Sequence, residues 1–103
     1  MIQEKNGWSC ITCQQPLHYK FGTLLNKGIL VAHRKNPPLS WTRRFSVDAG
    51  GCYAHDAVVE VYNSPTYDYC EIEVHAHLIP LKEDEEASHR QEWTFAARDF
   101  HPC

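Results

Sequence analysis

The sequence predicts an α+β domain with a small, mostly antiparallel sheet, one short helix and a C-terminal β-hairpin. Three segments alternate apolar and polar residues with the two-residue period of a half-buried strand. Turn signals rich in Gly, Pro and Asn separate these segments. At 103 residues, without a repeat or a long linker, the chain is expected to be a single domain over residues 1–103.

The first predicted element is a hairpin in the N-terminal third. Leu17, Tyr19 and Phe21 alternate with polar or small residues, which indicates a strand. An Asn-Lys-Gly turn signal at residues 26–28 and the apolar run 29–32 follow. We therefore expect the segments before and after this turn to pair.

The next segment is predicted to be a loop. Residues 36–38 read Asn-Pro-Pro, and proline has no N–H to donate to a strand ladder. The loop is expected to be held to the core by Trp41 and Phe45. The loop is expected to carry four basic residues, namely Arg34, Lys35, Arg43 and Arg44.

Residues 56–62 allow two interpretations. Val58, Val59 and Val61 favour a strand by their propensity. Ala57 and Val61 lie at helical spacing, and Asp56 is a suitable residue near a helix N-terminus, so a two-turn helix is also compatible.

The clearest predicted strand covers residues 69–79, where apolar and polar residues alternate strictly. Residues 93–97 alternate again, which predicts an antiparallel hairpin between 69–79 and about 90–99. A helix over 93–100 is the alternative. In the hairpin interpretation, four side chains enter the core: Ile72, Val74, Trp93 and Phe95.

Composition points to a globular protein. Hydrophobic residues make up 43% of the chain and charged residues 22%, close to globular averages. No apolar run approaches the ~20 residues of a membrane-spanning helix, and the first residues lack a signal-peptide core, so a cytoplasmic location is expected. The five cysteines are expected to be thiols or metal ligands and not disulfides.

Two cysteine motifs form a candidate zinc site. Cys10 and Cys13 have the Cys-x-x-Cys spacing, and Cys52 and His55 have the Cys-x-x-His spacing. Each spacing lets two soft ligands reach one ion from a single tight turn. Together they predict a structural zinc with four protein ligands, and the alternative is that the cysteines are free thiols packed in the core.

Two further groups are candidate partner-binding residues. The polar side of the strand over 69–79 presents a stripe that would bind a metal or perform acid–base chemistry, or would simply face solvent. The basic stretch 34–44, with Trp41 among the charges, has the composition of a phosphate-contacting loop or of an ordinary solvated loop. The residues of the two groups are Glu71, Glu73, His75 and His77, and Arg34, Lys35, Trp41, Arg43 and Arg44.

Several short motifs resemble a family of small domains encoded by phages and prophages, which have no assigned activity. The matching segments are Tyr19-Lys20-Phe21-Gly22, Gly50-Gly51-Cys52, residues 57–62, Glu71-Ile72-Glu73-Val74 and Arg98-Asp99-Phe100. In that family residues equivalent to 57–62 form a short helix. The resemblance therefore implies a phage context and the helical alternative for 56–62.

The expected function is that of a small phage-type accessory protein, non-enzymatic, which binds a host or defence macromolecule. The chain has no glycine-rich phosphate loop, no Gly-x-Ser-x-Gly and no His-Glu-x-x-His. One alternative is a small enzyme that acts on a nucleotide or an ADP-ribose-like ligand through the His/Glu strand face. Another is nucleic-acid binding through the basic loop 34–44, although the formal charge of −3 does not itself indicate this.

Overall fold

The computed structural model describes residues 2–13, 16–100 and 102–103. The chain forms strands connected by turns and by long irregular segments, with one 3-10 turn, η1 (Ala54–Asp56). The strands are β1 (Ile2–Lys5), β2 (Trp8–Ile11), β3 (Tyr19–Thr23), β4 (Ile29–Lys35), β5 (Pro38–Phe45), β6 (Val59–Asn63), β7 (Cys70–Val74) and β8 (Gln91–Ala96).

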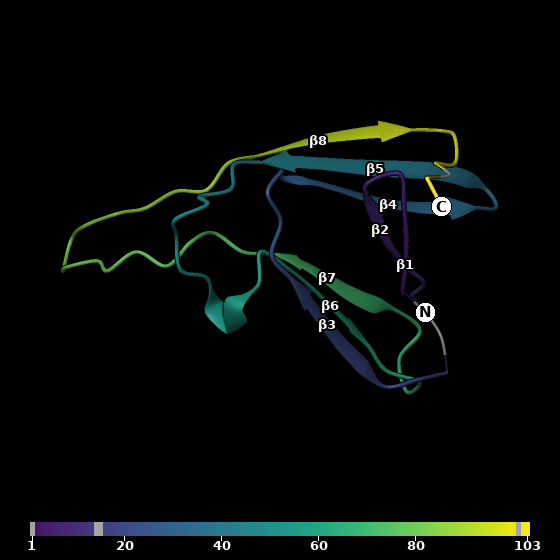
Figure 1. Ribbon diagram of the computed structural model, residues 1–103, viewed down its shortest axis with the longest axis horizontal. Coiled ribbons are helices and arrows are strands. Elements are labelled where there is room, and N and C mark those ends of the chain that lie inside the picture. Colours follow the sequence, from purple (N-terminus) through teal and green to yellow (C-terminus); the bar gives the residue numbers. More distant parts are fainter. Residues whose placement is uncertain (1, 14–15, 101) are drawn as a thin grey trace.

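The predicted α+β class is wrong, because the described part of the chain is nearly all β. The strands form three antiparallel sheets, with the orders β1–β2, β3–β6–β7 and β4–β5–β8. Figure 1 shows the two three-stranded sheets as separate layers that diverge toward the end where the termini and the β1–β2 hairpin lie. No helix among the described residues is long and apolar enough to cross a membrane.

Residues 59–63 form a central strand and not a helix. Strand β6 is hydrogen-bonded to β3 on one side and to β7 on the other. Val59 and Val61 are buried on one face of the strand, in agreement with the β propensity of the valines. The helical alternative for 56–62 is therefore wrong, and helical backbone is confined to the single turn η1 that precedes the strand.

Both predicted hairpins have the wrong partners. Strand β3 pairs with β6 and not with β4, and β4 pairs with β5. Strand β7 pairs with β6, whereas β8 pairs with β5 in the other sheet. An alternating pattern identifies the face that a strand buries, but it does not specify the neighbouring strand.

The predicted loop after residue 35 is also wrong. Lys35 lies opposite Pro38 in the ladder, so Asn36 and Pro37 form the tight turn between β4 and β5. Pro38 is the first residue of β5, a position at which a strand tolerates proline. The basic residues are consequently distributed along two strands.

The core is small and centres on β6. Tyr53, Ala57, Val58, Val59 and Val61 are buried. The partly buried Ile72 and Val74 pack against this cluster, as predicted. The other two predicted core residues do not enter it, because Trp93 and Phe95 are 54% and 60% exposed on β8.

A disulfide joins Cys10 in β2 to Cys103 near the C-terminus, across a sequence separation of 93 residues. The expectation that the cysteines are thiols or metal ligands is thus wrong for these two residues. Cys13, Cys52 and Cys70 are free.

The central position of β6 predicts that charge is excluded from its apolar face. Val61 is 4% exposed, so Val61→Asp buries a carboxylate without a partner and costs several kcal/mol, by an estimate of about 3 to 5. Because small domains are stable by only about 5 to 15 kcal/mol, this cost removes a large part of the stability, and we expect thermal denaturation followed by circular dichroism to show a strongly lowered melting temperature.

Thr94→Asp on the exposed strand β8 is the matched control for the same added charge. It should change the melting temperature by only a few degrees, since exposed positions tolerate substitution. Equal tolerance of aspartate at positions 61 and 94 would contradict the position of the core.

Candidate metal centre

The polar face of the β3–β6–β7 sheet carries two carboxylates in one row. Glu60 lies opposite Gly22 on one side and opposite Glu73 on the other. Residues directly opposite in antiparallel strands share a face, so both side chains point away from the core valines. Glu71 lies on the same face, opposite Tyr62, and the predicted polar side of β7 is therefore confirmed for Glu71 and Glu73.

Glu60 is buried although it lies on the polar face, and Gly22 provides the space. A Cβ atom added at Gly22 would lie 3.1 Å from the Ala57 Cβ and 3.7 Å from the Glu60 Cγ. The Glu60 side chain, 4% exposed, lies with its Oε2 3.3 Å from the Lys20 Nζ. The glycine thus allows the carboxylate to lie close to the surface of the sheet.

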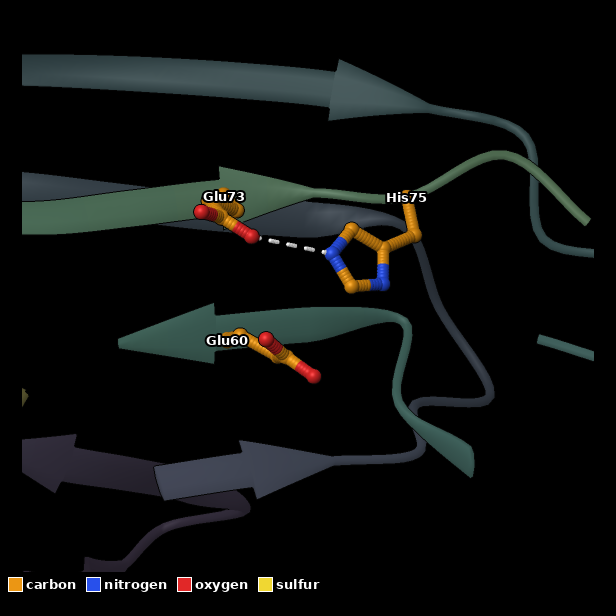
Figure 2. Close-up of side chains that lie close together, drawn as sticks. All are labelled: Glu60, Glu73 and His75. Atoms are coloured by element: carbon orange, nitrogen blue, oxygen red, sulfur yellow. Dashed lines mark hydrogen bonds and ion pairs between the residues drawn. The ribbon is translucent and has the colours of Figure 1, made fainter. Parts of the chain in front are cut away.

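His75 approaches the carboxylates from the end of β7, where the chain leaves the strand. Its backbone N–H donates to the Val58 carbonyl at 2.8 Å, and its ring Nδ1 lies 3.0 Å from the Ala57 carbonyl oxygen. These two contacts turn the ring back over the sheet, as Figure 2 shows. The ring Nε2 then lies 3.1 Å from the Glu73 Oε2.

A second histidine holds the other oxygen of Glu60. His55, within η1, has a positive φ of 57°, a left-handed conformation uncommon for residues other than glycine. Its Nδ1 lies 2.7 Å from the Glu60 Oε1. The turn before β6 therefore places an imidazole beside the buried carboxylate.

These contacts keep Glu60 ionised. Burial alone raises the pKa of the Glu60 carboxyl, but the hydrogen bonds and charges of His55 and Lys20 lower it, and the balance lies below the ordinary value of 4.5. Glu60, Glu73 and His75 each offer a ligand atom, and these atoms lie within 4.8 Å of one another. This group could hold a metal ion.

The four residues predicted to bind zinc are not brought together. Cys10 is in the disulfide, and the His55 ring lies on Glu60. Burial and the adjacent Cys70 thiol raise the pKa of Cys13 to about 12, so Cys13 remains protonated at neutral pH. Cys52 is exposed.

The predicted stripe on the strand over 69–79 is divided, because β7 ends at Val74. Glu73 and His75 meet Glu60, whereas the His77 Nε2 lies 3.8 Å from the Asp48 Oδ2. Sequence analysis missed Glu60 and Lys20. Glu60 is an acidic residue flanked by valines. If residues 59–63 are assigned to a strand, this pattern places Glu60 on the polar face, opposite the buried valines.

The predicted basic loop does not form one surface. Arg43 is buried, with its Nε 3.2 Å from the Gln91 Oε1 and its Nη1 3.4 Å from the Ile72 carbonyl oxygen in the other sheet. Its guanidinium also lies over the rings of Trp41 and Trp93. Arg34, Lys35 and Arg44 are exposed on β4 and β5.

Comparison of the chain with family models, with curated proteins and with solved structures finds no match. The resemblance to phage-encoded domains consequently stays a prediction.

The lowered pKa of Glu60 predicts a stability contribution that depends on pH. Because the folded pKa lies below 4.5, the contribution is fully present above that value and is lost as the pH falls through the folded pKa. We expect Glu60→Gln to be less stable than the unmodified protein at neutral pH. The difference in melting temperature should shrink as the solution is acidified below 4.5.

Glu71→Gln is the control, since Glu71 is exposed on the same face of the neighbouring strand. It should follow the unmodified protein at every pH. A difference between Glu60→Gln and the unmodified protein that stays constant into the acid range would contradict the assignment of the charge to Glu60.

Proposed function

We propose that the protein is a non-enzymatic binding module that engages another protein through exposed aromatic residues of the β4–β5–β8 sheet. The observation that carries this proposal is a surplus of accessible surface. The chain exposes 7789 Å², whereas a folded monomer of 11.9 kDa exposes about 6,000 Å². The radius of gyration is 15.2 Å, against about 13 Å for a compact domain of this length.

This surplus is larger than the area that one standard interface removes from a chain. It amounts to about 1,800 Å², and a standard interface buries about 800 Å² on each partner. Large apolar side chains contribute to it, because more of them are exposed than buried in the described chain. A partner that covers part of this area would supply the burial that the small core lacks.

The surface that we assign to the partner is an aromatic cluster of Trp41, Trp93 and Phe95. Trp41 stacks on Phe95, with ring centroids 5.7 Å apart and planes at 14°, and meets Trp93 edge-on at 4.9 Å. The three residues lie on the face of the sheet that also carries Leu30 and Phe45, which pack on the core. Tryptophan is enriched among the residues that dominate binding energy, and the buried guanidinium of Arg43 packs against both tryptophan rings.

Strand β8 also offers backbone groups. It pairs with β5 on one side and, like β4, is an edge strand of its sheet among the described residues (Figure 1). An edge strand with exposed side chains can accept an extended segment of a partner by backbone hydrogen bonds. The proposed partner segment is therefore an extended, apolar stretch of protein.

This function is favoured over the two alternatives. An enzyme that works through the His/Glu stripe would bring those side chains together, but the stripe is divided, because Glu73 and His75 lie beside Glu60 whereas His77 lies beside Asp48. Nucleic-acid binding through residues 34–44 would use a continuous basic surface, but Arg43 is buried.

If the phage resemblance holds, the partner is a host or defence protein. The cytoplasmic location stays a prediction, and the disulfide weighs against it because disulfides persist in oxidising compartments.

The test is a comparison of two exposed apolar sites. A double variant, Trp93→Ala with Phe95→Ala, removes the exposed part of the aromatic cluster, and Leu24→Ala alters an exposed apolar residue outside it. Immobilised unmodified protein and Leu24→Ala should retain the same bound protein from a native lysate, and the double variant should retain at least about tenfold less, because hot-spot truncations cost 2 kcal/mol or more.

Sedimentation of the purified chain provides the second arm. Self-association abolished by the double variant would identify a second copy as the occupant of the surface, and not a different protein. Equal retention by all three proteins, with a monomer in sedimentation, would overturn the proposal.

A further inference from the structure

The polar face of the β3–β6–β7 sheet holds an imidazole nitrogen that is directed at a carboxylate. The Ala57 carbonyl oxygen can only accept a hydrogen bond, so the Nδ1 of His75 carries the proton of that contact. The opposite ring atom, Nε2, faces the Glu73 Oε2 at 3.1 Å. With its proton on Nδ1, the ring presents the lone pair of Nε2 toward the Glu73 carboxylate, so that two donor atoms converge on one position.

The fixed Nδ1 contact is the arrangement found at metal-binding histidines. Such residues commonly donate their second ring N–H to a carbonyl or a carboxylate, which holds the ring and its tautomer. Glu60 is supported in the same way, because its Oε1 lies 2.7 Å from the His55 Nδ1. Two of the three ligand side chains are therefore oriented by neighbours outside the set.

The distances suit a transition-metal ion. Zinc binds imidazole nitrogen and carboxylate oxygen at about 2.0 to 2.2 Å, so an ion between atoms 3.1 Å apart would be bonded to both at an angle of roughly 100°. The widest separation within the group is up to 4.8 Å, which requires one side chain to move by about 1 Å. Glu73 is 52% exposed, so its side chain has room to rotate toward the buried Glu60.

The charges suit a divalent ion as well. Glu60 and Glu73 together supply two negative charges, and the imidazole is neutral when it acts as a ligand. Lys20, with its Nζ 3.3 Å from the Glu60 Oε2, is 53% exposed and can move into solvent when an ion enters. A nitrogen ligand in the set favours zinc and related transition metals over magnesium and calcium, which take oxygen ligands.

From these contacts we propose that Glu60, Glu73 and His75 form a binding site for one divalent transition-metal ion, with zinc as the metal that fits the donor set. The site lies on the sheet that does not carry the aromatic cluster, so it stands independently of the proposed partner surface. Three protein ligands leave a coordination position for water. A bound ion would connect the centre of β6 to the segment that follows β7.

The experiment uses Co²⁺ as a spectroscopic substitute for Zn²⁺ with the purified, disulfide-bonded full chain. The expected result is binding of one Co²⁺ per chain, with visible ligand-field bands, without thiolate charge-transfer absorption, and with displacement by Zn²⁺. Glu73→Gln and His75→Gln should each weaken Zn²⁺ binding, measured by calorimetry, by about tenfold or more. Mg²⁺ should not compete.

Matched variants separate this site from general charge and from the free thiols. Glu71→Gln removes the same charge two residues away on the same face and should leave the affinity unchanged. Lys20→Gln should tighten binding, because it removes a competing cation. Glu73→Gln alters an exposed side chain, so circular dichroism should show an intact fold and a loss of binding would report on the ligand.

Two results would overturn the proposal. The first is thiolate absorption in the Co²⁺ complex, which would move the ion to Cys13, Cys52 or Cys70. The second is an equal Zn²⁺ affinity of the Glu73→Gln and Glu71→Gln variants, or the absence of Zn²⁺ binding to both.

Discussion

Strand β6 is the constraint on which the rest of the structure depends. It is hydrogen-bonded on both edges and buried on both faces, with valines on one face and Glu60 on the other. The valines form the centre of the core, against which residues from the other sheet such as Leu30 and Phe45 pack. The same five-residue strand contributes side chains to the core and to the polar face. A change in the position of this strand therefore alters both surfaces of its sheet.

The features of the fold that could be predicted are those encoded by neighbouring residues. The alternation from Cys70 to Val74 identified both faces of β7, and the valines near residue 59 favoured a strand. The pairings of β3 with β6 and of β5 with β8 could not be predicted, since these strands are separated by some forty and about fifty residues. Trp93 and Phe95 alternate like core residues, but β8 lies where no described element covers them.

The candidate metal centre was predictable only in part for the same reason. Glu73 and His75 are two residues apart, and their proximity follows from local structure. Glu60 joins them through the register between β6 and β7, and Lys20 joins through the register between β3 and β6. The cysteine motifs were misleading because their spacing describes what a tight turn can do, whereas the partner of Cys10 lies at the other end of the chain.

The bond between Cys10 and Cys103 makes residues 10–103 a closed covalent ring. Residues 80–90 form a long exposed segment within that ring, between strands of different sheets. A single peptide-bond cleavage there would convert the ring into one open chain with new ends, and both original halves would remain attached. The two layers of the fold are thus joined by four connections, of which the backbone supplies three, between β3 and β4, between β5 and β6 and between β7 and β8, and sulfur supplies the fourth.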